Sequence, residues 1–468
     1  MGDFLISSVE IDGTPDMALR VSGGMITEVG ALRASAADDQ VLDGAGGALI
    51  PGLHDHHVHL RSWAAALGSV RVGPPEVTSP AELADALRRA AAKVATSPHR
   101  PHQPPAWVRG IAYHESVAGM LDAATLDAFV ASTPVRIEHR SGAMWFLNSA
   151  ALDRLGAHGS SDPAIERDDC GRPTGRIRRG NGWLADATGD AAPDLGRIGR
   201  DAAALGVTAF TDADPQRDAS AVDHLGAAMR AGSIPQRVQA MGQAGLVLPP
   251  HPRLTLGPVK VLLDDDAAAD VDAMTELILE ARRVERAVAI HCVTRLQLVA
   301  SLTALDAAGG PSAFGDRIEH GAVIPPELIG TLRRLRLTVV TQPGFVAERG
   351  DAYRRDVDPD DQPWLYRCRS LIDAGVPVLL STDAPYSTPD PWRAIGAAVR
   401  RKTPSGAVLG AAERITAPQA LARMSTSAAL RVGAPADVCL LGEPLSSALQ
   451  AEAGPTVVAT FVGGERIH

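Results

Sequence analysis

Short apolar runs alternate with helix-like segments through the middle of the chain. The helix-like patterns include residues 270–286 and 326–336. Strands that alternate with helices favour a parallel sheet, and eight such strands favour its closure into a ring. The pattern therefore predicts an α/β fold, a (β/α)8 TIM-like barrel. The apolar runs lie at 53–60, 206–213, 236–242, 259–265, 288–294, 317–324, 337–343 and 376–384.

Both ends of the chain carry a β pattern instead. Residues 1–52 show alternating apolar positions interrupted by Asp-Gly and Gly-Gly pairs, which are typical of hairpins, and residues 425–468 have a similar texture. Neither end has enough strands for a core of its own. We therefore expect the two ends to form one small composite β-sandwich beside a barrel over residues 53–424.

The stretch from about 61 to 200 is too long for a simple connection between the first two barrel strands. It contains two strand candidates, residues 107–114 and 134–140, and several helical pieces. We expect an α/β insertion over the C-terminal ends of the barrel strands, where barrel active sites lie. Such an insertion would supply a lid or much of the substrate pocket.

Composition and charge narrow the classes of function. The 468 residues are 45% hydrophobic and 21% charged, as in an ordinary globular protein with a substantial core. The net charge is −10 without a run of like charges, so nucleic acid is not an expected partner. No apolar run is long enough to predict a membrane span, and the N-terminus lacks a signal-peptide pattern. A cytoplasmic location is expected by default, with a small-molecule substrate as partner, and a homo-oligomer stays open.

The most informative segment reads LHDHHVHL. In a strand, side chains two positions apart share a face, so His57 and His59 can converge on one metal ion. Asp55 shares that face, whereas His54 and His56 point to the other side. We interpret His54 and His56 as core or supporting groups rather than ligands.

Three further polar residues follow separate apolar runs. His291 lies in VAIHCVT, His320 in RIEHGAVI and Asp383 in VPVLLSTDA. Each is near the C-terminal end of its run, where a barrel presents functional groups. Zinc accepts imidazole and carboxylate ligands, and a water molecule in its open position becomes a nucleophile near neutral pH. Together with the HxH pair, these residues predict a metal centre that activates water.

Lys260 stands in the apolar stretch VKVLLDD, although the chain has only two other lysines, Lys93 and Lys402. A buried ammonium group is costly unless it is paired. Burial lowers the pKa of lysine, and the neutral amine can then react with CO2 to give a carbamate that bridges two cations. The alternative is a lysine paired with Asp264 or Asp265.

These segments carry a resemblance to a known family. PGLHDHHVHL, VKVLLDD, VAIHC, RIEHGAVI and STDAP occur here in that order, with NSAAL in the insertion and TQPGF before the last barrel strand. The chain resembles the amidohydrolase superfamily over nearly its entire length, and in particular the YtcJ-like branch called amidohydrolase family 3. The resemblance implies the barrel and the composite sandwich as the fold.

The resemblance also implies roles for the site residues. The first two imidazoles would bind the more buried of two divalent cations, expected to be zinc, and the last two would bind the second. Lys260, as N6-carboxylysine, would bridge them, although one cation per subunit is also compatible. Asp383 would contact metal and act as catalytic acid and base. The implied metal ligands are His57, His59, Lys260, His291, His320 and Asp383.

The expected substrate is a small amide-like molecule, namely an amide, formamide, cyclic imide or urea. The family often has a histidine shortly before the NSAAL motif, where this chain has Met144 and Trp145. This difference favours an apolar or aromatic-accepting surface. We expect Tyr113 and Trp145 of the insertion, and Tyr386 after Asp383, to contact substrate.

Other functions stay open at this point. A deaminase of the same superfamily would use one metal and a His-x-x-Glu arrangement, but the residue three positions beyond His291 is Thr294. A lyase or isomerase can use the same site, because fold does not fix the reaction. A non-catalytic scaffold on this fold would lose ligands, whereas all six positions are filled here. Cys292 is a poor candidate nucleophile, because neighbours in a strand point to opposite faces.

Overall fold

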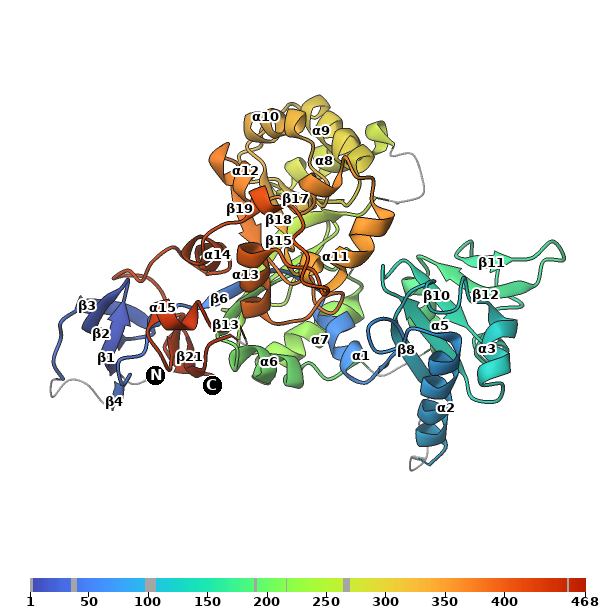
Figure 1. The fold of residues 1–468 in the computed structure, drawn as a ribbon, viewed down its shortest axis with the longest axis horizontal. Helices are drawn as coiled ribbons and strands as arrows, with labels where there is room; N and C mark the ends of the chain where they lie inside the picture. The colour runs from blue at the N-terminus through green and yellow to red at the C-terminus, as the bar shows by residue number, and fades with distance from the viewer. Residues whose placement is uncertain are drawn as a thin grey trace. The chain divides into compact units, whose positions relative to one another are not determined.

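The computed structural model describes residues 3–34, 40–96, 107–188, 192–215, 217–263, 270–452 and 454–468. The chain forms two compact units (Figure 1). The barrel unit comprises Met1–Leu60 and Leu195–His468, and the insertion unit comprises Arg61–Asp194. Among the described residues, no helix is long and apolar enough to cross a bilayer.

Eight parallel strands form the centre of the barrel unit, in the order β19-β18-β17-β16-β15-β14-β13-β6. Strand order follows chain order, as expected for repeated β-α units that wind around one axis. The predicted barrel class is confirmed. The strands are β6 (Leu53–Val58), β13 (Val207–Asp212), β14 (Arg237–Gly242), β15 (Leu254–Val261), β16 (Val288–Cys292), β17 (Arg317–His320), β18 (Thr338–Thr341) and β19 (Val378–Leu380).

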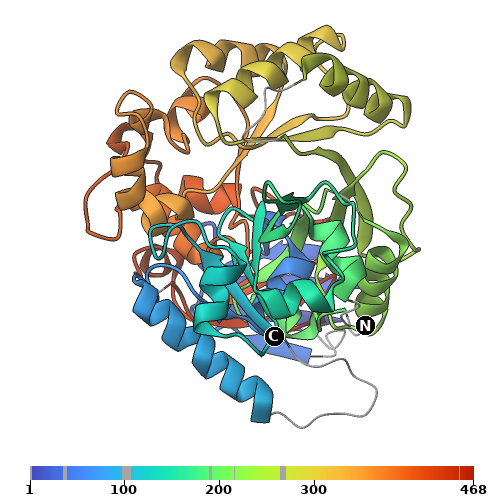
Figure 2. The ribbon, with the colours of Figure 1, turned by 90° about the vertical axis from the view of Figure 1, so that its right-hand side faces the viewer.

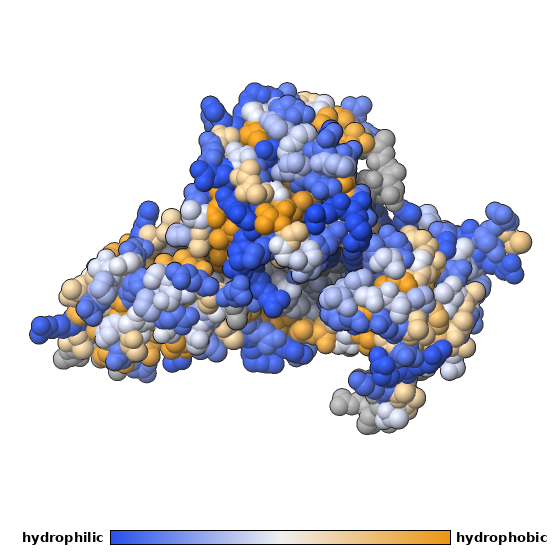
Figure 3. All heavy atoms as spheres, in the orientation of Figure 1, coloured by the Kyte–Doolittle hydropathy of each residue, from blue (hydrophilic) through white to orange (hydrophobic). Residues whose placement is uncertain are grey.

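Helices follow most of these strands and cover their outer side. In Figure 2 the helices from α8 to α10, yellow to light orange, lie outside the strands. In Figure 3 the exposed face of these helices is mostly hydrophilic. The strands are largely buried, and β6 and β17 carry polar side chains beside the apolar ones. The helices are α6 (Gly196–Ala203), α7 (Ala219–Arg230), α8 (Val271–Arg283), α9 (Arg295–Ala307), α10 (Pro326–Arg334), α11 (Gly344–Asp356), α12 (Arg369–Asp373), α13 (Pro391–Arg400) and α14 (Ala417–Arg423), with short 3-10 turns η1 (Gln362–Trp364) and η2 (Ala411–Glu413).

Two four-stranded sheets from the chain ends pack on each other in the same unit. Their shared core includes Leu19 from one sheet and Val438 from the other, and the rings of Phe4 and Phe461 stack at 5.1 Å. The sheets have the orders β3-β2-β1-β4 and β22-β21-β20-β5, so each end supplies what the other lacks. The elements are β1 (Phe4–Ile11), β2 (Thr14–Ser22), β3 (Met25–Gly30), β4 (Gln40–Asp43), β5 (Leu49–Pro51), β20 (Val438–Leu441), α15 (Leu445–Ala448), β21 (Val457–Val462) and β22 (Glu465–Arg466).

The insertion unit has a six-stranded sheet with its own apolar core. Asn148 of the NSAAL motif is fully buried, and its side-chain oxygen accepts hydrogen bonds from the backbone N–H groups of Ala151 and Val135. The motif thus caps a helix and ties it to the sheet. The elements are α1 (Leu60–Leu67), β7 (Val70–Arg71), α2 (Pro80–Thr96), β8 (Val108–Tyr113), α3 (Ala123–Phe129), β9 (Val135–His139), β10 (Met144–Leu147), α4 (Ser149–Arg154), β11 (Ile165–Arg167), β12 (Pro173–Arg178) and α5 (Asn181–Thr188).

Candidate metal centre

The candidate site forms where the first and last barrel strands meet. The N–H of Asp383 donates to the carbonyl of His57 at 2.9 Å, and the N–H of His59 donates to the carbonyl of Ala384 at 2.8 Å. These two bonds join the end of β6 to the segment after β19. They bring Asp383 next to both histidines of the HxH pair, although more than 300 positions separate them in sequence.

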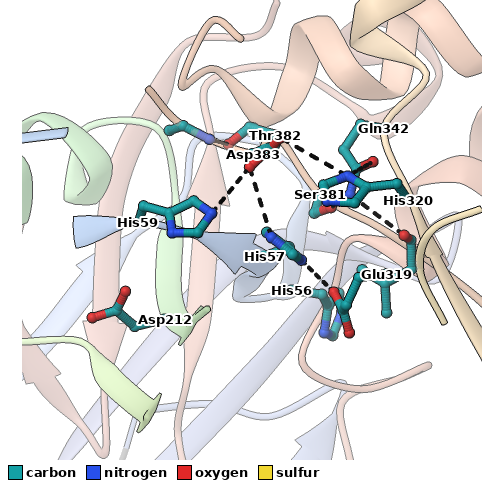
Figure 4. Close-up of polar contacts among 12 residues, drawn as sticks. His56, His57, His59, Asp212, Glu319, His320, Gln342, Ser381, Thr382 and Asp383 are labelled. Carbon is teal, nitrogen blue, oxygen red and sulfur yellow. Dashed lines mark hydrogen bonds and ion pairs between the residues drawn. The ribbon is translucent and has the colours of Figure 1, made fainter. Parts of the chain in front are cut away.

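Two of the predicted ligands leave their strands in an unusual backbone conformation. His320 has φ 67° and Asp383 has φ 60°, in the left-handed region that side chains other than glycine rarely adopt. Such conformations are costly and concentrate at functional sites. In both cases the turn occurs at the C-terminal end of a barrel strand and directs the side chain toward the same cluster (Figure 4).

His57, His59 and Asp383 form a group whose ligand atoms all lie within 4.8 Å of one another. The Oδ1 atom of Asp383 is 3.5 Å from Nε2 of His59 and 3.7 Å from Nε2 of His57 (Figure 4). Among the described residues this buried oxygen has no hydrogen-bond partner. A buried carboxylate oxygen facing two imidazole nitrogens is an arrangement that a cation completes.

The protonation states suit a cation. Burial opposes ionisation of Asp383, but contacts with His59 and His320 hold the pKa of its carboxyl well below its usual range. Burial, helped by the charge of Lys260, moves the pKa of His57 far below its ordinary value. The pKa of His320 falls to about 3, mainly because of burial. The carboxylate is therefore an anion and these imidazoles are neutral, as metal ligands must be.

Lys260 and His320 lie against the same group. Nζ of Lys260 is 3.4 Å from Nε2 of His57, and Nδ1 of His320 is 3.9 Å from Oδ2 of Asp383. The rings of His291 and His320 are 4.6 Å apart. Burial lowers the pKa of the Lys260 amine to about 8. Lys260 and His320 thus lie beside the group of His57, His59 and Asp383, and His291 contacts His320. That Lys260, His291 and His320 are ligands stays a prediction.

Asp55 has a different role from the ligands with which it shares a face. Its carboxylate accepts hydrogen bonds from the N–H of Thr382, at 3.0 Å, and from the Thr382 hydroxyl. It therefore holds the segment that leads into Asp383. On the other side of β6, Nε2 of His54 lies 2.9 Å from the hydroxyl of Thr211, and its ring is 3.9 Å from that of His56.

The predicted substrate contacts have different surroundings. The ring of Tyr386 meets the ring of His59, one of the candidate metal ligands, edge to face at 5.4 Å. In the insertion unit, Tyr113 is fully buried and donates its hydroxyl to the carbonyl of Gly119 at 2.7 Å, and Trp145 lies beneath the guanidinium of Arg109. Substrate binding by these three aromatic residues stays a prediction.

Sequence reasoning missed the residues that hold the imidazoles. Nδ1 of His57 contacts the buried carboxylate of Glu319, which Arg317 binds with its Nε at 2.6 Å. Nδ1 of His320 lies 3.0 Å from the side-chain oxygen of Gln342. The sequence held one signal that could have found them. Arg317 and Glu319 stand two positions apart in the segment RIEH, and a guanidinium and a carboxylate that are buried in a strand need partners.

Comparisons with known proteins agree with this geometry. The amidohydrolase family profile matches residues 40–468. N-substituted formamide deformylase from Arthrobacter pascens is 28% identical over 482 residues, covering 90% of this chain and 86% of that protein. YtcJ from Bacillus subtilis (strain 168) is 28% identical over 134 residues, which is 29% of this chain and 25% of that protein.

Solved structures show the same fold. An uncharacterized metal-dependent hydrolase from Pyrococcus horikoshii OT3 superposes with a TM-score of 0.71 at 19% identity, covering 94% of this chain and 98% of that one. A second, from Pyrococcus furiosus, has a TM-score of 0.67 at 20% identity, with 93% and 98% covered. The family profile spans the barrel and most of the sandwich, and it includes His57, His59 and Asp383. The chain belongs to the amidohydrolase family.

Proposed function

We propose that the protein is a metal-dependent hydrolase that uses activated water to cleave a non-peptide C–N bond of a small molecule. The substrate class is an amide, formamide, cyclic imide or urea. The observation that carries the proposal is the group of His57, His59 and Asp383, whose buried carboxylate oxygen has no hydrogen-bond partner in the part of the chain that the structure describes. The similarity to a formamide deformylase supports a substrate with an amide-like bond.

A divalent cation, with zinc as the expected ion, would polarise the scissile carbonyl and lower the pKa of a water molecule at this site. His57, His59 and Asp383 would hold it. Asp383 is ionised, because contacts with the histidines lower its pKa against the effect of burial. Its carboxylate would accept a proton from the attacking water, which the cation would make more acidic. The same carboxyl would then deliver that proton to the leaving nitrogen.

We propose that Lys260 becomes a carbamate and that His291 and His320 complete a second metal position. With a pKa of about 8, a substantial part of the amine is neutral near physiological pH. The neutral amine adds to CO2 and loses one proton, which gives an anionic carboxylate within reach of His57, 3.4 Å from the amine nitrogen. The alternative partners Asp264 and Asp265 lie outside the described residues.

The deaminase alternative has less support. A deaminase would need a proton-carrying glutamate three residues beyond His291, where Thr294 stands. Thr294 instead begins α9: its hydroxyl accepts from the N–H of Gln297, whose side chain in turn accepts from the N–H of Thr294. In this capping box the side chain of Thr294 stabilises the N-terminus of α9.

Metal analysis of the purified protein is the first test. Two equivalents of metal support the bridged site, one supports the deaminase, and none supports a non-catalytic scaffold. Metal-loaded protein is then screened against amides, formamides, hydantoins and aminoheterocycles. The expected result is a carboxylic acid and an amine from amides or formamides, or a single ring-opened acid from hydantoins. Release of ammonia from aminoheterocycles alone would contradict the proposal.

The matched variants are Asp383→Asn and Asp316→Asn. Asp316 is as deeply buried as Asp383 but precedes β17, and its carboxylate accepts from the N–H of Val288. Asp383→Asn should lower kcat by roughly 10²- to 10⁴-fold, the usual contribution of a general acid and base, with the fold retained. Asp316→Asn should keep kcat within a few-fold of the native protein. Near-normal turnover in Asp383→Asn would remove its catalytic role.

A further inference from the structure

Glu319 is a buried carboxylate that points across the barrel interior. It is fully buried and lies on β17, and its Oε2 atom contacts Nδ1 of His57 on β6 (Figure 4). Arg317, two positions earlier on the same face of the strand, binds both carboxylate oxygens, with distances of 2.6 and 3.2 Å. The Arg317 guanidinium also donates to the carbonyl of His56 at 2.8 Å. These contacts fix the carboxylate and β6 to each other.

This contact determines how His57 presents its other nitrogen. A neutral imidazole has one proton, and the carboxylate of Glu319 retains that proton on Nδ1. The lone pair of Nε2 then faces the space shared with Lys260 and Asp383, which lie 3.4 and 3.7 Å away. A carboxylate acceptor behind a histidine fixes its tautomer and makes it a stronger donor to metal. The guanidinium of Arg317 forms a buried ion pair with the carboxylate of Glu319 at 2.6 Å.

The hydrogen-bond partner of His320 Nδ1 is a neutral amide, and the Asp383 carboxylate lies farther from the same nitrogen, at 3.9 Å. Nδ1 of His320 lies 3.0 Å from Oε1 of Gln342, whose amide nitrogen donates to the hydroxyl of Ser381 at 2.9 Å. The amide therefore presents its oxygen to the imidazole, and it fixes the same tautomer. A neutral amide polarises an imidazole less than a carboxylate does, because it carries no net charge. The two supported histidines differ in donor strength.

We infer that Glu319 is a positioning residue that makes the His57 position the tighter of two metal positions, so that the cation at His57 and His59 binds first. Gln342 leaves the position at His320 weaker. This inference rests on the proposed metal-dependent function and specifies the order in which the site is filled. It assigns no contact between Glu319 and the substrate.

The experiment titrates metal-free protein with Zn²⁺ in competition with a chelating dye, and repeats the titration with Co²⁺ while recording its visible spectrum. In Glu319→Gln the first equivalent should bind about 10- to 100-fold more weakly, the usual effect of losing such a support. The second equivalent should change little. Glutamine has the same shape and still accepts from Nδ1, so the change removes charge rather than volume.

Glu413→Gln is the matched control. Glu413 is also a buried carboxylate bound by an arginine, Arg367 at 2.8 Å, and it accepts from the N–H groups of Cys368 and Ser370. A general loss of packing would affect both variants, whereas metal affinity should fall only in Glu319→Gln. Should Glu319→Gln not fold, Arg317→Lys keeps the positive charge but loses the forked contact, and its first equivalent should bind more weakly too.

The outcomes separate the two levels of the argument. Native protein that binds no metal overturns the proposed function. Native protein that binds metal, with an unchanged first equivalent in the folded Glu319→Gln or Arg317→Lys variant, overturns only the role of Glu319. A weaker first equivalent in Glu413→Gln as well would also overturn it, because the effect would then not depend on contact with His57.

Discussion

Asp55 allows a quantitative test of the free-energy cost of a buried charge in the interior of this barrel. Its carboxyl is buried beside the metal group, and burial raises its pKa from an ordinary 3.8 to about 7 in spite of the hydrogen bonds from Thr382 and His57. We consider Asp55→Asn in the metal-free protein. Asparagine has the same shape and keeps an oxygen for the N–H of Thr382, but it has no proton to lose.

The direction in which Asp55 changes the stability of the fold with pH follows from proton binding. Between about pH 4 and pH 7 the folded protein retains the Asp55 proton more tightly than the unfolded chain does, so this residue stabilises the fold at low pH. That contribution is lost as the pH rises through 7. At about 1.4 kcal/mol per pKa unit, ionised Asp55 costs the folded state about 4 kcal/mol, and about 2.5 kcal/mol of this develops between pH 5 and pH 8.

The assay is urea unfolding of metal-free native protein and Asp55→Asn at pH 5 and pH 8. The variant should gain stability relative to the native protein by about 2.5 kcal/mol on going from pH 5 to pH 8. Asp122→Asn is the control that should show no pH dependence in this range. Burial alone would raise the pKa of the Asp122 carboxyl, which caps α3, but hydrogen bonds from Thr125 lower it below its ordinary 3.8. Asp122 is therefore ionised in the folded and the unfolded state at both pH values, so the stability difference should be the same at pH 5 and pH 8. A stability difference for Asp55→Asn that is independent of pH would refute the reasoning.

Three shorter predictions concern other parts of the molecule. Lys260→Ala should lose the second equivalent of metal, with activity partly restored by a short-chain carboxylate, and full metal content in this variant would exclude the carbamate. Tyr386→Ala should raise KM with metal content unchanged, because the ring lies edge-on to His59 at 5.4 Å; an unchanged KM and substrate preference would remove Tyr386 from the pocket. Asn148→Ala breaks four hydrogen bonds, three of them buried, and should destabilise the insertion unit by about 3 kcal/mol in hydrogen-exchange measurements, whereas a loss below about 1 kcal/mol would show that the NSAAL cap is dispensable.

The fold could be predicted because its signals are local. Each barrel strand is a short apolar run, and each end of the chain has too few strands to fold without the other. The two end sheets accordingly share one core, in which Phe4 stacks on Phe461. The apolar periodicity of the sequence does not show which strands are neighbours. The strand order could be predicted because consecutive strands of a parallel barrel usually lie side by side.

The candidate ligands could be located in the sequence for a related reason, but the residues that contact them could not. A histidine at the C-terminal end of a barrel strand reaches the site whatever its neighbours are, so His291 and His320 stand out in sequence. Glu319 faces His57 from a strand three places away in the sheet, counted through β18 and β19. That pairing depends on the closure of the ring and on side-chain lengths. Gln342 was hidden in the same way within the motif TQPGF.

Closure of the barrel and assembly of the site are one event in this protein. The two backbone bonds at the seam join His57 to Asp383 and His59 to Ala384, so they set the register of the seam and the spacing of three ligands at once. A slip of one residue would turn the HxH face away from Asp383, because strand side chains alternate. Side chains hold β6 as well. The carboxylate of Asp55 on β6 accepts a hydrogen bond from Thr382. From β17, Glu319 contacts His57 and Arg317 donates to the carbonyl of His56. The polar residues of the barrel interior thus fix the register of β6, and this register determines whether a cation can be held.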